Sequence, residues 1–203
     1  NLGRLEGHAR WFMQHPRPGQ DSYVLGFDVR LTEHYWRLHH LVEPEVKTHP
    51  VAVLAVCHGA APRPGSAEQE ATLEDARVVW ETDVLGTYRL ASAVWPYMAG
   101  GDGGSIAFVS SKHSDATYPN RVPYTTAKAA LSGLMRGLAL DWGSYNIRVN
   151  AILPWQVEGP RTAQVQRSEG EDTLPLYLAK SPLRRLVDPQ DVARTVLWLA
   201  TCQ

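Results

Sequence analysis

Short, continuously apolar stretches alternate with longer stretches of helical periodicity along most of this chain. Four of the apolar stretches have the length and β-branched character of buried strands: Tyr23–Phe27, Val51–Val56, Ser105–Ser110 and Ile147–Leu153. Strands that are apolar on both faces are typical of a parallel sheet that helices cover on both sides. The sequence therefore predicts an α/β fold, a doubly wound parallel sheet in a single domain over residues 1–203.

The stretches between and after these strands predict the helices. Apolar residues recur at helical spacing in four ranges, which are 31–42, 73–82, 87–98 and 124–142. A last helix begins at Asp188, a good capping residue, with Pro189 at the first helical position and Asp191 in the first turn. Strands and helices thus alternate almost to the end of the chain.

Charge and composition exclude several classes of protein. A net charge of -1 gives no basic field for nucleic acid and no attraction to anionic lipid. The two cysteines, Cys57 and Cys202, build neither a disulfide framework nor a zinc site. No apolar run approaches the roughly 18 residues of a membrane span. We expect no nucleic-acid or membrane partner, and a cytoplasmic location.

Two residues four positions apart carry the strongest chemical signal. Tyr124 and Lys128 share one face of the predicted helix 124–142, with Cβ atoms about 6 Å apart, and Ser111 follows the strand before it. A free tyrosine has a pKa of about 10, and a nearby ammonium lowers that pKa by favouring the phenolate. Lowering it to about 7 takes roughly 4 kcal/mol, of which one close cation in a dry cleft could supply a large part. The alternative is a surface Tyr–Lys pair, which the neighbouring strand ends disfavour.

Four segments of the chain form a recognisable set. They are Gly104–Ser111, Tyr124–Ala130, Ile147–Pro154 and Ser181–Ala193. Together they resemble the short-chain dehydrogenase/reductase family of the classical type, over nearly the whole chain from Asp28 onward. The resemblance implies a Rossmann-like fold and an enzyme that transfers hydride between a nicotinamide cofactor and the CH–OH or carbonyl group of a small alcohol or ketone.

The resemblance also implies catalytic roles. Tyr124 would be the general acid/base on the substrate oxygen, and Ser111, at the usual family distance before it, would hydrogen-bond that oxygen. Lys128 would lower the pKa of Tyr124 and hold the nicotinamide ribose. Positioning of the reacting groups would then supply much of the rate.

The cofactor is expected to be NADP or NAD. The residues expected around it are Arg4, Asp28, Val29, His58, Gly59, Ala60, Tyr124, Lys128, Pro154 and Val157. Arg4 falls near the position at which the family discriminates NADP from NAD, and a guanidinium there can grip a 2′-phosphate. The alternative is a surface charge at a helix start. We expect NADP ahead of NAD.

Three positions depart from the family pattern. His58 stands where the family has Asn, and it is either a proton carrier or a structural histidine. Asp83 replaces an Asn on the helix; a carboxylate accepts hydrogen bonds but cannot donate them, so Asp83 holds a water near Lys128 or pairs with it directly. We count Asp83 among the candidate catalytic residues. Trp155 replaces a Gly. Three alternatives are open for its ring: it narrows the cleft, it stacks on the substrate, or it packs in the core.

The family's Gly-rich phosphate turn has no counterpart here, since no glycine before Asp28 follows a predicted strand. A helix is expected at 5–13 instead. Without the family's first two strands, Tyr23–Phe27 would lack its neighbour and Val51–Val56 would become an open apolar edge. We therefore expect the chain to be a clipped form of a longer one that has a further N-terminal segment and a last C-terminal strand.

The range 155–181 lacks regular periodicity and is expected to be a lid over the substrate site, or else a disordered insert. Together with Trp155 and Tyr118, this range indicates an apolar or aromatic substrate. The resemblance implies a homodimer or homotetramer through helices 87–98 and 124–142. Three histidines, His34, His39 and His40, form no metal set, and no metal is expected.

Two other functions stay open. The three altered positions favour a catalytically silent family member that acts as a binding or interaction subunit. Against this, Ser111, Tyr124 and Lys128 are all intact, which a silent protein would not need. A Ser–Lys hydrolase that uses Ser111 is disfavoured, because no nucleophile elbow surrounds this serine.

Overall fold

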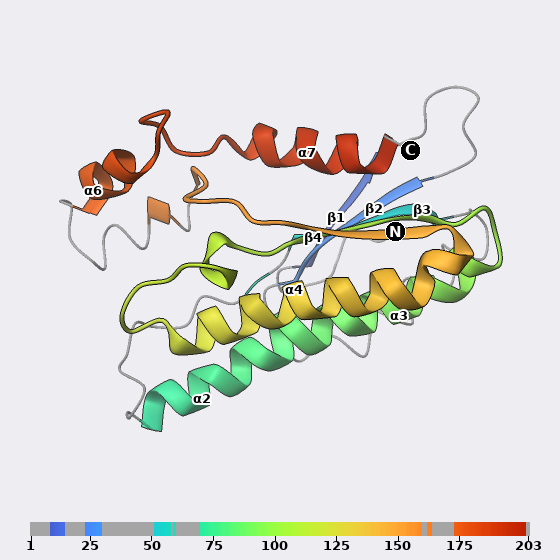
Figure 1. The fold of residues 1–203 in the computed structure, drawn as a ribbon, viewed down its shortest axis with the longest axis horizontal. Helices are drawn as coiled ribbons and strands as arrows, with labels where there is room; N and C mark the ends of the chain where they lie inside the picture. The colour runs from blue at the N-terminus through green and yellow to red at the C-terminus, as the bar shows by residue number, and fades with distance from the viewer. Residues whose placement is uncertain are drawn as a thin grey trace.

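The computed structural model describes residues 9–14, 23–29, 51–57, 59, 70–159, 162–163 and 173–201. These residues form a five-stranded sheet with helices on both of its faces (Figure 1). The elements in chain order are β1 (Ala9–Gln14), β2 (Tyr23–Val29), β3 (Val51–Val56), α2 (Glu70–Val79), the π-helix η2 (Trp80–Leu85), α3 (Gly86–Ala99), β4 (Gly104–Val109), the 3-10 helix η3 (Lys112–Ser114), α4 (Val122–Trp142), the 3-10 helix η4 (Gly143–Tyr145), β5 (Ile147–Ile152), α6 (Thr173–Lys180) and α7 (Pro189–Thr201).

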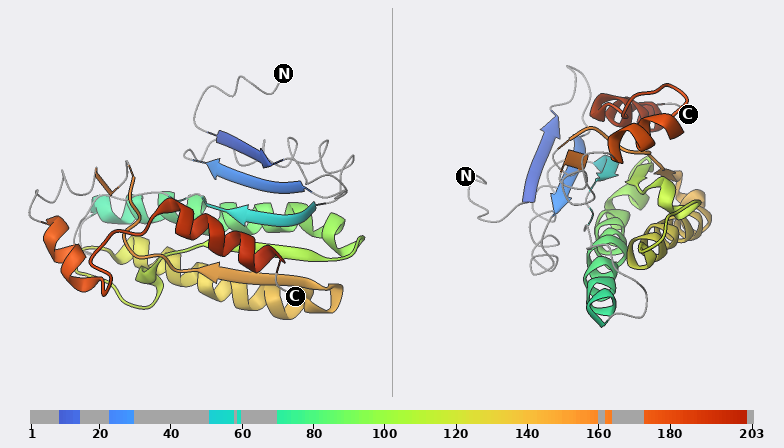
Figure 2. Two further views of the ribbon diagram at one scale, coloured as in Figure 1. Left: turned by 90° about the horizontal axis from the view of Figure 1, so that it is seen from above. Right: turned by 90° about the vertical axis from the view of Figure 1, so that its left-hand side faces the viewer.

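The strands lie side by side in the order β1-β2-β3-β4-β5. From β2 to β5 neighbouring strands run parallel, and β1 runs antiparallel to β2 at one edge (Figure 2). Helices α3 and α4 pack on one face of the sheet, and α7 crosses the other face. The predicted doubly wound α/β sheet is confirmed, and the carboxyl ends of β2 to β5 share one edge of it.

The helix predicted at 5–13 is wrong where the structure describes it. Residues 9–14 form strand β1, which pairs with β2 from Ala9 opposite Val29 to Gln14 opposite Val24. Apolar spacing in so short a segment fits a helix or a strand, and the two aromatic residues in it, Trp11 and Phe12, favour a strand. Pairing with β2, a partner that periodicity cannot show, decides between the two.

The predicted open edge at Val51–Val56 is also wrong. Strand β2 lies against β3 in parallel, from Tyr23 opposite Val51 to Phe27 opposite Val56. Strand β2 therefore has a neighbour on each side, β1 and β3. An apolar strand with an unpaired edge leaves backbone donors and acceptors without partners, so the chain gains stability by closing it.

The helices predicted at 73–82 and 87–98 form one continuous helical run from residue 70 to residue 99. The π-helix η2 joins α2 to α3, and Gly86 continues the run with helical dihedrals, φ -60 and ψ -46. π-Helical turns are rare in proteins, and those that occur are frequently found at functional sites. Here it carries Thr82, Asp83 and Val84, all of which are buried.

The core lies between the sheet and helices α3 and α4. Its fully buried members include Leu54, Leu90, Val94, Met98, Ile106 and Phe108. Burial of a side chain of this size contributes about 1.5–3 kcal/mol, which holds the two helices firmly against β3 and β4. Ser110 adds a polar link, because its Oγ donates to the carbonyl oxygen of Lys128 at 3.1 Å. The end of β4 is thus tied to the first turns of α4.

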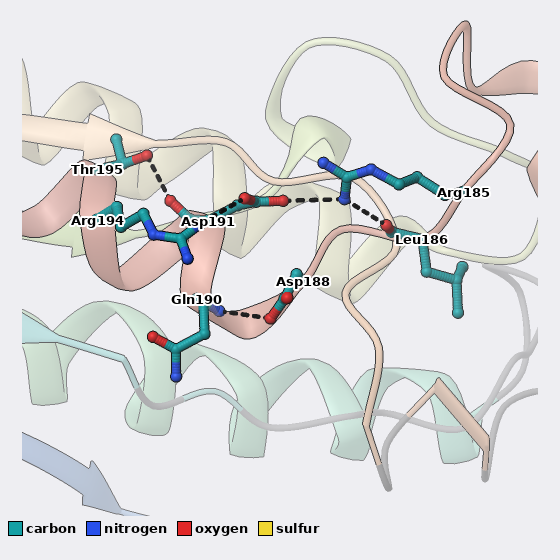
Figure 3. Close-up of polar contacts among 7 residues, drawn as sticks. All are labelled: Arg185, Leu186, Asp188, Gln190, Asp191, Arg194 and Thr195. Atoms are coloured by element: carbon teal, nitrogen blue, oxygen red, sulfur yellow. Dashed lines mark hydrogen bonds and ion pairs between the residues drawn. The ribbon is translucent and has the colours of Figure 1, made fainter.

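The start of α7 confirms the predicted cap. The backbone N–H of Gln190 donates to Asp188 Oδ1 at 2.8 Å (Figure 3). Asp191, in the first turn, contacts Arg185 Nη1 at 2.9 Å and Arg194 Nη1 at 3.5 Å. The hydrogen bond from Arg185 is the main cause that lowers the pKa of Asp191, and both guanidinium charges act in the same direction.

The sequence predicted irregular structure over the whole range 155–181, and the structure shows that this is wrong for the last part of the range. Its last part is helix α6, which extends beyond the sheet in Figure 1. Residues 155–159 and 162–163 are also described, and Val157 forms a parallel bridge with Val187 just before α7. Whether the range is a lid stays a prediction.

Within the described part of the chain, no helix is long and apolar enough to cross a membrane.

Candidate active site

The predicted catalytic residues lie where β4 and β5 end. Ser110 N donates to Ile152 O at 2.8 Å, and Lys112 N donates to Pro154 O at 3.1 Å, so the two strand ends continue side by side. Ser111 lies between these bonds and is buried. Carboxyl ends of parallel strands form the ligand-binding edge of open α/β sheets.

A buried ion pair lies beside this edge. Lys128 Nζ is 2.8 Å from Asp83 Oδ2, with side-chain exposures of 3% and 0%. Asp83 Oδ2 makes no hydrogen bond within the described structure, so the contact is a close ion pair. Of the two arrangements that the sequence left open, Asp83 adopts the direct pairing. Two buried charges are tolerated only when each has its partner.

Tyr124 lies next to this pair. The ring centroid of Tyr124 is 5.4 Å from Lys128 Nζ, as the spacing of four residues predicted. The ring of His113 packs against it edge to face, with centroids 5.4 Å apart. Ser111 Oγ in turn accepts a hydrogen bond from the backbone N–H of His113 at 3.2 Å. The structure thus brings Tyr124, Lys128 and Asp83 together, and His113 contacts both Ser111 Oγ, through its backbone, and the Tyr124 ring.

An aromatic row extends from Tyr124 away from the ion pair. Successive ring centroids are 5.3 Å apart for His113 and Tyr118, 5.8 Å for Tyr118 and Trp155, and 6.2 Å for Trp155 and Tyr177. Trp155, for which the sequence left three alternatives, packs within this row. Sequence reasoning missed His113 and Tyr177. The only available signal was position, since His113 follows Ser111 by two residues and Tyr177 lies in the expected lid.

The expected cofactor residues are described in part. Asp28 and Val29 end strand β2, and Gly59 closely follows β3, so all three lie toward the edge that holds Ser111. Pro154 and Val157 follow β5, and Val157 O accepts a hydrogen bond from Thr162 Oγ1. Arg4, His58 and Ala60 lie outside the described residues, as do His34, His39 and His40.

Two further observations limit where a ligand can be sought. No cluster of three metal-ligating side chains occurs within residues 70–159 or elsewhere in the described chain. A hollow of about 470 Å³ lies between the start of β5 and the end of α7, lined by Ala139, Asn146, Trp198 and others. It lies at the amino end of β5, away from Tyr124, and is not the candidate active site.

A sequence profile described as enoyl-(acyl carrier protein) reductase matches residues 14–203. The chain belongs to the short-chain dehydrogenase/reductase family. This match covers nearly the whole chain and confirms the family resemblance of the motifs around Ser111 and Tyr124.

Relatives in the short-chain dehydrogenase/reductase family are named as oxidoreductases. The 7alpha-hydroxysteroid dehydrogenase of Escherichia coli is 33% identical over 143 residues, which are 70% of this chain and 53% of that protein. The trans-4-hydroxycyclohexanecarboxylate dehydrogenase of Sinomonas cyclohexanicum is 34% identical over 137 residues, 68% of this chain and 49% of that one. The chain thus spans about half the length of the curated relatives it matches.

Solved structures of the family confirm the Rossmann-like fold. A 7alpha-hydroxysteroid dehydrogenase complexed with NADH and 7-oxo glycochenodeoxycholic acid superposes with a TM-score of 0.73 at 27% identity, covering 84% of this chain and 66% of that chain. A short-chain type dehydrogenase/reductase from Mycobacterium ulcerans reaches a TM-score of 0.77 at 23% identity, with 86% and 63% covered. ElxO with NADP bound has a TM-score of 0.74 at 22% identity, with 85% and 68% covered. The last two bear on the fold alone.

Proposed function

We propose that this protein is an NAD(P)-dependent oxidoreductase that transfers hydride between nicotinamide and the CH–OH or carbonyl group of an alcohol or ketone. The observation that carries the proposal is the buried Asp83–Lys128 pair beside Tyr124, at the strand end that also holds Ser111. The relatives are named as dehydrogenases and reductases, which supports the same reaction class.

The described residues fit a nicotinamide nucleotide. Lys128 has three N–H donors, of which Asp83 occupies one side, so donors remain for the hydroxyls of a ribose. Gly59 beyond β3 has no side chain to keep the backbone away from a ligand. When bound, the nicotinamide supplies or accepts the hydride.

The chain's own residues move and hold the proton. Tyr124 gives its phenolic proton to the substrate oxygen during reduction and takes it back during oxidation. The ammonium of Lys128 favours the phenolate that forms at Tyr124 Oη, and Asp83 keeps that ammonium in place. Ser111 donates to the same substrate oxygen and orients it. His113, held by Ser111 and packed on the Tyr124 ring, limits the movement of both.

Three expectations stay predictions. The preference for NADP over NAD depends on Arg4, which lies outside the described residues. Self-association as a dimer or tetramer would use α3 and α4. A cytoplasmic location is the third of these predictions.

The test compares turnover of the parent protein with turnover of a variant that lacks the phenolic hydroxyl of Tyr124. The intact protein is mixed with a panel of alcohols and ketones and each nicotinamide cofactor, and nicotinamide absorbance is followed. Tyr124→Phe should lower kcat by about 10²–10⁴-fold without loss of secondary structure. Tyr145→Phe, which removes the hydroxyl of an exposed tyrosine on η4, is the matched control. Full turnover in Tyr124→Phe, or none in the parent protein with any substrate, would overturn the proposal.

A further inference from the structure

The aromatic row beside Tyr124 carries two positive charges. Lys112 Nζ lies 3.9 Å from the ring centroid of Trp155 and 5.6 Å from that of Tyr118. Lys180 Nζ lies 4.6 Å from the centroid of the same Tyr118 ring. Because both ammonium groups approach one ring, they are at most about 10 Å apart. One lysine follows β4 and the other ends α6, so the fold brings them together from distant segments.

Neither ammonium has a carboxylate partner among the residues that the structure describes. In residues 70–159 and 173–201, and in the rest of the described chain, no Asp or Glu oxygen lies within 4.0 Å of Lys112 Nζ or Lys180 Nζ. Ring faces stabilise a cation but leave its charge in place. Two uncompensated charges on one ring repel each other, and a bound anion would remove that cost. This arrangement contrasts with Lys128, which has Asp83 at 2.8 Å.

The same row holds two buried donors without an acceptor. Tyr118 Oη and Trp155 Nε1 are inaccessible to solvent and make no hydrogen bond within the described structure. Burial raises the pKa of Tyr118, so its hydroxyl keeps the proton and stays a donor at neutral pH. Burial also raises the pKa of Tyr177, against the effect of the Arg121 charge. Buried donors normally have partners, so these two favour a ligand that accepts hydrogen bonds.

We propose that the substrate is an anion with a ring, a hydroxy or keto carboxylate whose ring lies along Tyr118 and Trp155 and whose carboxylate is bound by Lys112 and Lys180. The inference rests on the proposed function, since it places the reacting carbon at Tyr124. The row of rings supplies apolar area, the two ammonium groups supply charge, and the two buried donors match the carboxylate oxygens. A ring-bearing carboxylate is the ligand class that meets all three features.

The inference is tested with a pair of ketones that differ in charge and by one methyl group. Binding of 6-acetyl-2-naphthoate and of its methyl ester to the intact protein is measured by titration calorimetry with NADP or NAD present, and reduction of each ketone by NADPH or NADH is followed separately by absorbance. We expect the acid to bind at least about tenfold more tightly than the ester, with the preference falling as salt approaches about 1 M, where screening acts over about 3 Å. Equal binding of acid and ester would overturn the inference.

Variants assign the effect to the two lysines. Lys180→Met and Lys112→Met should each weaken binding of the acid about tenfold and leave binding of the ester within about twofold. Lys180→Arg should keep the preference, because it keeps the charge. Arg136→Met, which removes an exposed cation from the middle of α4, is the control and should change neither. An equal loss for acid and ester in both lysine variants would show a purely structural role and overturn the inference.

The outcomes separate this inference from the proposed function. Tighter binding of the acid without turnover of any ketone or alcohol would leave the anion site standing and overturn the oxidoreductase proposal. Turnover of both ketones without a preference for the acid would leave the oxidoreductase proposal standing and overturn the anion site. In Tyr124→Phe the acid should still bind more tightly than the ester although turnover is lost.

Discussion

The chain holds carboxylate–cation contacts in two different environments. In the candidate active site, Asp83 and Lys128 are 2.8 Å apart, with exposures of 0% and 3%. At the start of α7, Asp191 and Arg185 are 2.9 Å apart, with exposures of 35% and 53%, and Arg194 joins them (Figure 3). The separations are nearly equal, so distance does not distinguish the two contacts.

Burial distinguishes them. Water and salt screen the charges of Asp191 and Arg185, and each is well solvated when the other is removed. Asp83 and Lys128 have given up their hydration, so each depends on the other. The exposed contact therefore affects only the stability of the first turn of α7. The buried contact couples the stability of the whole fold to the position of the ammonium beside Tyr124.

The largest expected effect comes from removing the buried cation. Lys128→Met leaves the Asp83 carboxylate buried without its counter-charge, and we expect the free energy of unfolding to fall by about 3–5 kcal/mol. Urea denaturation followed by circular dichroism measures this loss. Arg194→Met, which removes an exposed cation from the Asp191 contact, is the control and should be nearly neutral. Equal losses in the two variants would break the comparison.

The double variant Asp83→Val with Lys128→Met sharpens this test. It removes both charges, and we expect it to regain most of the lost stability or to exceed the parent protein. Turnover stays lost in the double variant, because no ammonium remains beside Tyr124. A double variant that is less stable than Lys128→Met would show that packing and not charge sets the cost.

A smaller effect is expected for Asp83→Asn, which keeps the shape and removes the charge. An amide oxygen still lies next to the Lys128 ammonium but carries less negative charge, and we expect a loss of about 1.5–3 kcal/mol in urea denaturation. The Lys128 ammonium then lacks its counter-charge beside Tyr124, so we expect turnover to change together with stability. Unchanged turnover in Asp83→Asn would count against the placement of this pair next to the reacting proton.

The cap of α7 is expected to contribute less. Asp188→Ala removes the acceptor of the Gln190 N–H and should cost about 1 kcal/mol, without a change in kcat. Thermal unfolding and steady-state rates on the same preparation measure both quantities. Asp188→Ser restores an acceptor and should recover the loss.

The smallest effect is expected for Asp191→Asn. We expect the Tm to fall by no more than about 2 °C, and added salt to remove the difference. The pKa of Asp191 is lowered in the folded protein, so its contribution is present above the unfolded value, near 3.8, and is lost as pH falls through the folded value. The parent and the variant should therefore converge in stability below that pH. A constant difference across pH would mean that Asp191 acts through packing.

Local signals in the sequence were sufficient for much of the fold and for the proximity of Tyr124 and Lys128. Apolar runs predicted β3, β4 and β5, helical spacing predicted α4, and the Asp188-Pro189 pair marked the start of α7. The spacing between Tyr124 and Lys128 predicted their proximity, because one helical turn sets it without any other part of the chain. Each of these features depends on neighbours within a few residues.

Contacts between distant segments were decided only by the tertiary structure. Residues 9–14 have a spacing that suits a helix, and pairing with β2 makes them a strand. Asp83 had two possible arrangements, and the packing of η2 on α4 selects the direct ion pair with Lys128. The same holds for Lys112 and Lys180, which meet on the Tyr118 ring although no periodic pattern links them. Such contacts follow from the folding of the whole sheet, and short-range patterns in a sequence contain no record of them.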